Sequence, residues 1–469
     1  MLTLCPSRFA MRSRTLATLA MGDAPYALAD AIVAGGRRRG YVVTEPSTGK
    51  VLASDAAMQP VADFLQGGCI DYLGHEGLFL EVGRRTGALC GAFLWNTKRG
   101  AAGGGIRLRP YDSVEEYIVD GLRLATGMGR KSALTGLWHG GGKGVIAQAE
   151  GERHRDAAYR ADLFADYGDF LTSLRGCYIA AEDSGVNVQD MDIVFSRSRF
   201  TTCISPSLGG SGNPSVPTAA GVAMAMEAAL EFLGSTNAPE RAFEGLSFAV
   251  QGCGNVARPL MHNLLSKGAA RIVASDVDAG SIEQARTELA ASGHDVAKVE
   301  LKQVGFGDNS ILAEDVDVVS PCAWGGVLTP ETCAAIRAQV VCGAANSQLL
   351  DPDDDCGMAA AGVTYVPDFV ANPMGIVNCA NEMYGRVGAL GTTEDPMLSD
   401  RLGREYEFSV FNSTLRVLRA ASEQGTSTAV SANALADELC TQLHPIWAPD
   451  HRSQQIMNSL VNGTWADDA

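Results

Sequence analysis

Three features are scarce in this sequence of 469 residues, and each absence excludes a class of protein. No run of about 18 apolar residues could span a bilayer, so we expect no membrane partner. The sequence has only 37 Lys and Arg against 54 Asp and Glu, so its formal net charge is −17, which argues against a nucleic-acid partner. The 12 cysteines include no CxxC pair, and we predict buried, reduced thiols with neither disulfides nor a metal site.

The composition that is present, 46% hydrophobic and 19% charged, is that of a core-forming protein of two or three domains. The only basic run, residues 35–40, is expected to be a solvated loop. The N-terminal stretch carries Arg8, Arg12 and Arg14 before its first acid, Asp23. Acid-free, arginine-bearing starts resemble organellar presequences. Residues 1–30 are therefore predicted to be a targeting or flexible segment, with a mitochondrial location favoured over a cytoplasmic one; a disordered tail or a start at Met21 are the alternatives.

Hydrophobic periodicity changes character along the chain. Apolar residues at helical spacing predict helices over 112–135, 156–176 and 218–233. Beyond these, short apolar runs separated by helical patterns are typical of a parallel, doubly wound sheet. The expected strands cover 246–252, 270–276, 316–323, 338–346 and 362–372. The Gly/Ser/Pro-rich stretch 205–217 is the predicted domain junction.

A dinucleotide signal follows the first of these strands. Gly252-x-Gly254-x-x-Ala257 stands between a predicted strand and a predicted helix, where glycines allow a tight turn and close approach to a pyrophosphate. The next strand ends at Asp276, whose carboxylate suits a ribose 2′-hydroxyl and repels a 2′-phosphate, so NAD fits better than NADP. The alternative is a structural glycine turn followed by a chance aspartate. The predicted cofactor loop also includes Asn255 and Val256.

The stretch "GLWHGGGKGVIA", residues 136–147, places one lysine among glycines and apolar residues. It is no phosphate-binding P-loop, because Leu137 and Gly144 occupy the positions of the leading glycine and the Ser/Thr. We predict that Lys143 lies in a dry pocket, where burial and a second cation lower its pKa and suit it to acid/base work. Lys131 could be that second cation and bind a substrate carboxylate. The alternative for both lysines is ordinary surface exposure.

The partner acid is expected within residues 178–194, which contain Glu182, Asp183, Asp190 and Asp192. Asp190 and Asp192 fit the start of a helix, where carboxylates favour the helix dipole. Asp183 follows the apolar run "CYIAA" and precedes a glycine, a strand-end position where catalytic groups collect in α/β folds.

The ordered segments "GGIR", "GMGRK", "GGGKGVI", "AAEDSG", "QDMDIV", "GSGNPSVPTAAGV", "VQGCGNVA", "PCAWGGVL", "CGAANSQL" and "YVPDFVANPMGIVN" resemble the Glu/Leu/Phe/Val dehydrogenase superfamily, most closely its leucine/phenylalanine/valine branch. The resemblance covers roughly residues 75–390. It implies an α/β chain of two domains: a substrate and oligomerisation domain over 31–205 and a Rossmann-like NAD-binding domain over 206–390. C-terminal helices over 391–469 return towards the first domain. It also implies NAD-dependent oxidative deamination of an L-amino acid, commonly in a homo-oligomer.

The resemblance assigns roles residue by residue. Lys143 matches the lysine that activates water, and Asp183 the acid/base aspartate. Lys131, with the backbone at Gly104 and Gly105, matches the substrate-carboxylate site. The remaining matches lie near the nicotinamide: Asn346 near both nicotinamide and substrate, Thr218 at the carboxamide, and Cys322 and Ala323 at the nicotinamide ribose.

The expected substrate is an apolar amino acid, branched-chain or aromatic. Glutamate enzymes of the superfamily carry a lysine at the position of Gly103, and a buried carboxylate without that cation would be costly. Matching pocket positions are Ala181, Ile376 and Cys379, all apolar, while Trp324 and Met374 depart from the family pattern. The alternatives are a catalytically silent NAD-binding regulatory relative and a glutamate-type dehydrogenase. A hydroxy-acid dehydrogenase would want a His–carboxylate pair, and His139 has no evident partner in the sequence.

Overall fold

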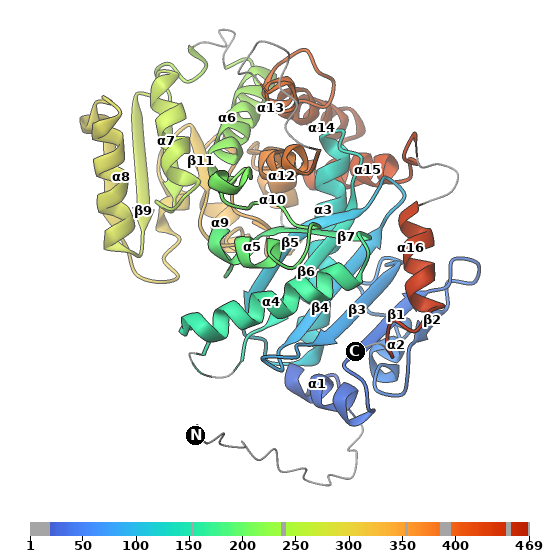
Figure 1. Ribbon diagram of the computed structural model, residues 1–469. Helices are drawn as coiled ribbons and strands as arrows, with labels where there is room; N and C mark the ends of the chain where they lie inside the picture. The colour runs from blue at the N-terminus through green and yellow to red at the C-terminus, as the bar shows by residue number, and fades with distance from the viewer. Residues whose placement is uncertain are drawn as a thin grey trace, which may run out of the picture.

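A computed structural model describes residues 19–149, 151, 153–235, 241–351, 355–384, 395–446 and 452–467. The chain forms two α/β lobes, each built on its own sheet (Figure 1). Most of the predicted targeting segment lies outside the described residues, although its end, from Pro25, begins the first helix. Among the described residues, no helix is long and apolar enough to cross a bilayer.

The first lobe contains a seven-stranded mixed sheet in the order β2-β1-β3-β4-β6-β5-β7. β5 pairs in parallel with both β6 and β7, and the other pairings are antiparallel. The strands are β1 Arg39–Thr44, β2 Val51–Ala53, β3 Gly77–Val82, β4 Leu89–Asn96, β5 Ala102–Arg109, β6 Gly140–Ala147 and β7 Tyr178–Glu182.

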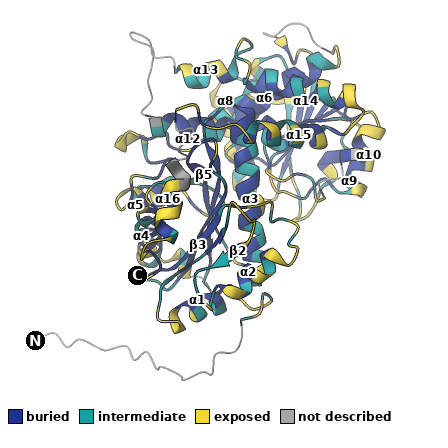
Figure 2. Cartoon of the chain, turned by 90° about the vertical axis from the view of Figure 1, so that its right-hand side faces the viewer, coloured by how far each residue is buried: buried dark blue, intermediate teal, exposed yellow. Residues whose placement is uncertain are grey.

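Helices cover both faces of this sheet, so its central strands are buried (Figure 2). One face packs against α1 Pro25–Ala34, α2 Gln59–Gln66 and α3 Val114–Leu134. The other packs against α4 Ala157–Ser173 and α5 Val188–Phe195. Ser113 caps α3 by accepting from the Glu116 N–H at 3.0 Å, as expected for an N-cap serine followed by acids.

The second lobe is a six-stranded, fully parallel sheet in the order β10-β9-β8-β11-β12-β13. This is the Rossmann-like arrangement predicted from the alternation of apolar runs and helices. Its strands are β8 Ser247–Gln251, β9 Arg271–Asp276, β10 Val299–Gln303, β11 Val318–Pro321, β12 Val340–Val341 and β13 Thr364–Tyr365.

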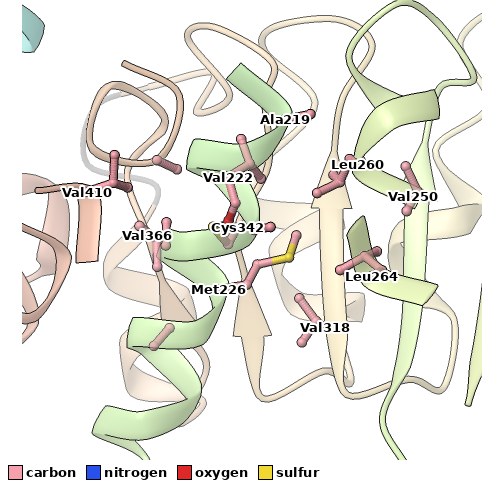
Figure 3. Close-up of a cluster of buried hydrophobic side chains, with 14 of the residues drawn as sticks. Ala219, Val222, Met226, Val250, Leu260, Leu264, Val318, Cys342, Val366 and Val410 are labelled. Atoms are coloured by element: carbon pink, nitrogen blue, oxygen red, sulfur yellow. Dashed lines mark hydrogen bonds between the residues drawn. The ribbon is translucent and has the colours of Figure 1, made fainter. Parts of the chain in front are cut away.

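The main core of this lobe lies between the sheet and α6 Ser215–Phe232 and α7 Ala257–Ser266, where Val222, Met226 and Leu264 meet Val250 and Val318 (Figure 3). A second core covers the opposite face of the sheet. The remaining helices of this lobe are α8 Ala279–Ala291, α9 Pro330–Ala335, α10 Asp355–Ala360, α11 Asp368–Ala371 and α12 Met374–Tyr384.

The C-terminal helices return to the first lobe, as predicted. Arg130 of α3 makes an ion pair with Asp437 at 2.7 Å, so a helix near the C-terminus lies against the first lobe. Trp465 packs edge-on against Phe79 of β3 with ring centroids 5.3 Å apart. Figure 1 shows α16 beside β1 and β2 accordingly. These helices are α13 Pro396–Leu402, α14 Val410–Gln424, α15 Thr428–Cys440 and α16 Arg452–Val461.

Three expectations about local structure were wrong. The expected strand over 338–346 is limited to β12. The basic run 35–40 is only partly a solvated loop, because Arg39 opens β1 and pairs with buried Glu81 at 2.6 Å. The expected strand over 362–372 is limited to β13, because Pro367 has no N–H to donate to the strand ladder, and residues from Asp368 form α11 instead. The described cysteines are free thiols, as predicted.

Candidate active site

The glycines around Lys143 allow helices and strands to approach the central strand β6 closely. A Cβ on Gly141 would lie 2.9 Å from the backbone N of Gly129 in α3. A Cβ on Gly142 would lie 2.9 Å from the Ala102 Cβ of β5. The run of glycines is therefore required by close packing on both sides of the strand. Lys143 is carried on this strand and is 3% exposed.

Lys143 and Asp183 form a direct ion pair. The Lys143 Nζ lies 2.7 Å from the Asp183 Oδ2, although 40 residues separate them in the sequence. Asp183 follows the end of β7, and β5 lies between β7 and β6 in the sheet. The parallel pairing of β5 with β6 and β7 thus brings together Lys143, in the middle of β6, and Asp183, just beyond the end of β7.

Arg107 is a third charged member of this cluster, and the sequence analysis missed its role. Its Nε lies 3.1 Å from the Asp183 Oδ2, and its Nη1 lies 3.1 Å from the Asp120 Oδ1 of α3. Tyr111 donates to the same Asp120 carboxylate at 2.8 Å. Arg107 ends the quoted "GGIR" segment, which was the available signal. Asp183 therefore accepts from two cations on one oxygen.

The environment lowers the pKa values of both catalytic candidates. Burial lowers the pKa of Lys143 and the Arg107 charge lowers it further, against the opposing effect of Asp183. Burial alone would raise the pKa of Asp183, but the Lys143 and Arg107 charges outweigh it and hold that pKa below its usual range. A carboxylate kept ionised beside a lysine whose ammonium is destabilised can accept a proton and pass it on.

The neighbouring Glu182 has the opposite behaviour. Burial and the charge of Asp190 raise its pKa to about 7, although Asn213 donates to its Oε1 at 3.1 Å. Its Oε2 is buried and has no hydrogen-bond partner among the described residues. Two adjacent carboxyl groups at the end of β7 thus differ in protonation near neutral pH.

Lys131 connects the two lobes. It lies on α3, and its Nζ is 3.1 Å from the Oδ1 of Asn346, which follows β12 of the second sheet. Asn372 donates to the same oxygen at 3.1 Å. Burial lowers the pKa of Lys131 and the Lys143 charge lowers it further, while Asp368 opposes both. Asp368, which accepts from the Ser347 N–H at 3.0 Å, is a second charged residue that the sequence analysis missed.

The predicted cofactor loop is a tight glycine turn between β8 and α7. Gly252 adopts φ +100°, and a Cβ there would lie 3.2 Å from that of Ala323. A Cβ on Gly254 would meet nothing within 4 Å, so the loop is open where a pyrophosphate approaches. α7 begins at Ala257, directly after Asn255 and Val256. The Asp276 Oδ2 accepts from the Cys253 N–H at 2.7 Å, which places the predicted ribose-binding carboxylate beside this loop.

Other predicted positions lie in both lobes. The Cys322 N–H donates to the Gln251 carbonyl at 2.9 Å, next to the glycine loop. A Cβ on Gly375 would lie 3.0 Å from the Thr218 Oγ1, so the α12 backbone approaches this threonine. In the predicted side-chain pocket, a Cβ on Gly103 would lie 3.1 Å from the His139 Nδ1. Cys379 has its sulfur 3.2 Å from that of Cys203.

A Rossmann-like sheet in one lobe, and a buried lysine paired with an aspartate in the other, are typical of a two-domain, nucleotide-dependent oxidoreductase. Family models match in the same order along the chain. Residues 90–200 match the "Glu/Leu/Phe/Val dehydrogenase, dimerisation domain", and residues 209–440 match "Glutamate/Leucine/Phenylalanine/Valine dehydrogenase".

Characterised relatives agree with these matches. Leucine dehydrogenase of Bacillus cereus is 36% identical over 353 residues, covering 75% of this chain and 86% of the relative. Valine dehydrogenase of Streptomyces coelicolor is 34% identical over 379 residues, covering 80% and 94%. The solved L-tryptophan dehydrogenase of Nostoc punctiforme superposes with a TM-score of 0.60 at 27% identity, covering 78% of this chain and 96% of that one. The chain belongs to the Glu/Leu/Phe/Val dehydrogenase family and is an amino acid dehydrogenase that uses a pyridine nucleotide.

Proposed function

We propose that this enzyme catalyses the reversible, NAD-dependent oxidative deamination of an apolar L-amino acid to the 2-oxo acid and ammonia. The observation that carries the proposal is the 2.7 Å contact between Asp183 and the buried Lys143. In the forward direction an amino acid, water and NAD⁺ give the 2-oxo acid, ammonia, NADH and a proton. NAD, when bound, accepts the hydride from the substrate α-carbon.

Substrate binding is assigned to Lys131. Its ammonium group forms a charge-assisted hydrogen bond with the substrate α-carboxylate. Asn346 holds that ammonium group from the other lobe, at 3.1 Å. The same contact brings the substrate site next to the strand ends that carry Cys322 and Ala323. The backbone at Gly104 and Gly105 completes the carboxylate site.

Proton transfer is assigned to the ion pair. Asp183, kept ionised by two cations, accepts a proton from the substrate amino group and later returns it to the leaving ammonia. Lys143, whose ammonium is destabilised by burial, activates the water that adds at the α-carbon and stabilises the oxygen of the carbinolamine. Arg107 does not reach the substrate in this scheme and acts by orienting Asp183.

The apolar substrate class rests on the residues around Gly103. A substrate side chain directed there meets the His139 ring, whose pKa is lowered to about 4 by burial and by the charge of His444. Such an imidazole is neutral at pH 7 and cannot form an ion pair with the γ-carboxylate of glutamate. This supports leucine-, valine- or aromatic-type substrates over glutamate. An intact Lys131, Lys143 and Asp183 set also favours an active enzyme over a silent regulatory relative.

NAD rather than NADP is proposed because Asp276 ends β9 beside the glycine loop, where its charge would repel a 2′-phosphate. A homo-oligomer is proposed because residues 90–200 match a dimerisation domain. The decisive experiment follows NADH formation from each of the twenty L-amino acids at alkaline pH. We expect turnover with branched-chain or aromatic substrates and none with glutamate. Turnover confined to glutamate, or no NAD-linked turnover at all, would refute the proposal.

A further inference from the structure

An exposed pair of aromatic side chains lies near the cofactor loop. Among the described large hydrophobic side chains that are exposed, three are aromatic: Phe306 at 85%, Trp324 at 63% and Phe195 at 42%. Phe306 and Trp324 contact each other, with ring centroids 6.3 Å apart and planes inclined by 70°. Two rings in this arrangement form an angular corner, and both side chains of the corner are exposed. Paired aromatic exposure of this kind is typical of a binding surface.

Both aromatic residues lie on loops at the carboxyl edge of the second sheet. Phe306 follows β10 and Trp324 follows β11. β8 and β9, which lead into the glycine loop and Asp276, lie between those two strands. The two rings can meet only because their loops extend over the ends of β8 and β9. The corner is thus directly above the predicted cofactor site.

The hydrogen bonds of the two loops support this placement. Gln251, the last residue of β8, donates from its side chain to Asn309 at 2.8 Å, which fixes the Phe306 loop. Its carbonyl accepts from the Cys322 N–H at 2.9 Å, which fixes the Trp324 loop. The Val304 N–H donates to the Asp276 carbonyl at 3.0 Å. Both aromatic loops are therefore anchored at the residues that flank the glycine turn.

We propose that Trp324 and Phe306 form the adenine-binding corner of the cofactor site, with the purine stacked on the indole of Trp324. This inference rests on the proposed use of NAD. With the pyrophosphate at Gly252–Gly254 and the ribose at Asp276, the adenine attached to that ribose must lie at the same sheet edge. Val277, which follows Asp276, is also an exposed apolar residue. A purine fits because every base presents a π-face to an aromatic side chain.

Trp324 is also one of the positions where this sequence departs from its family, in which leucine is common. An indole offers a larger stacking surface than leucine, so the adenine contact is a property of this chain. Trp324→Leu is therefore a substitution that the fold should accommodate. Trp324→Phe keeps an aromatic face and should restore most of the binding.

The test measures equilibrium binding by calorimetry, without turnover, for NADH, ADP-ribose and reduced nicotinamide mononucleotide. ADP-ribose lacks only the nicotinamide base, and the mononucleotide lacks the adenosine half of the cofactor. We expect Trp324→Leu and Phe306→Ala to weaken NADH and ADP-ribose binding by about 5- to 100-fold and to leave mononucleotide binding unchanged. Phe195→Ala, which removes an exposed aromatic side chain of the first lobe, is the matched control and should change none of the three.

The outcomes separate this inference from the proposed function. If the wild-type enzyme binds neither NADH nor ADP-ribose, the use of NAD is refuted and the adenine corner with it. If the wild type binds both and the Trp324 and Phe306 variants bind ADP-ribose equally well, only the adenine corner is refuted. A change of oligomeric mass in these variants with unchanged ADP-ribose binding would identify the pair as a subunit contact and would also overturn the inference.

Discussion

The Lys131 ammonium group lies 3.1 Å from the Asn346 side-chain oxygen, although the two residues belong to different lobes and stand 215 positions apart. The helix α3 carries Lys131 within reach of the same charge cluster that contains Lys143 and Asp183. One amide oxygen thus links the predicted carboxylate site to the predicted nicotinamide site. The contact therefore joins the two lobes next to the predicted substrate site.

Removal of the Lys131 charge should affect substrate binding more than chemistry. We expect Lys131→Met to raise the KM for the amino acid by about 10- to 150-fold, because a charge-assisted hydrogen bond of roughly 1.5–3 kcal/mol is lost. NADH affinity should stay within about twofold, as a calorimetric titration would verify. Lys298→Met, at an exposed lysine of the second lobe, is the control. An unchanged KM would remove Lys131 from the substrate site.

Arg107 is predicted to position Asp183 and to lower its pKa. Arg107→Gln removes one of the two cations on the carboxylate, so the pKa of Asp183 rises and the acidic limb of the kcat/KM profile moves to higher pH. Loss of orientation should also lower kcat on the order of 10- to 100-fold. Arg123→Gln is the control. Arg123 of α3 pairs with Asp71 at the surface, so this variant should leave the pH profile unchanged. A profile identical to that of the wild type would contradict the assigned role.

Glu182 should make the folded state less stable as the pH rises. Its folded pKa is raised to about 7 against an ordinary 4.5, so the unfolded chain loses this proton first and stability falls between those two pH values. Glu182→Gln removes this loss. In urea unfolding followed by circular dichroism, we expect the free energy of unfolding of the variant to exceed that of the wild type by about 1 kcal/mol at pH 8 and to equal it at pH 4. Equal gains at both pH values would show that titration is not the cause.

The glycine at position 141 should tolerate no side chain. A Cβ there would lie 2.9 Å from the Gly129 N, so Gly141→Ala forces α3 away from β6 and should cost about 1–3 kcal/mol of stability or more. Gly127→Ala in α3 is the control. A Cβ at Gly127 meets no described atom within 4 Å, and alanine favours a helix. Thermal unfolding should show a lower midpoint for the first variant only.

Asp276 should govern the choice of dinucleotide. Asp276→Ser removes the charge that repels a 2′-phosphate, so we expect the ratio of kcat/KM for NAD over NADP to fall by about 10-fold or more. The Cys253 N–H, which now donates to this carboxylate, could then bind phosphate oxygens. The two cofactors are compared by initial rates at fixed substrate. An unchanged ratio would show that the carboxylate does not contact the ribose.

Those features that depend on local patterns could be predicted from the sequence. The glycine turn at Gly252 and the strand-end position of Asp183 follow from a few neighbouring residues, and the structure has both. The burial of Lys143 was predicted from the apolar residues on both sides of it in the sequence. Family resemblance then supplied the roles, which local chemistry alone left open.

Features that depend on tertiary contacts could not be predicted. Arg107 meets Asp183 only because β5 and β7 pair in parallel, and nothing near Arg107 in the sequence shows that pairing. Arg39 looked solvated within a basic run, but β3 brings Glu81 beside it. The segment after β13 has the composition of a strand, and Pro367 with its tertiary surroundings makes it helical. Each error reflects a partner distant in the sequence.

The most direct test of the account is the steady-state rate of Asp183→Asn, measured with the preferred amino acid at saturating NAD and substrate. An amide cannot accept the proton of the substrate amino group, so kcat should fall by about 10²- to 10⁴-fold while calorimetry shows NADH affinity within about threefold of the wild type. A kcat close to that of the wild type, with NADH binding intact, would contradict the assignment of proton transfer to the pair formed by Lys143 and Asp183.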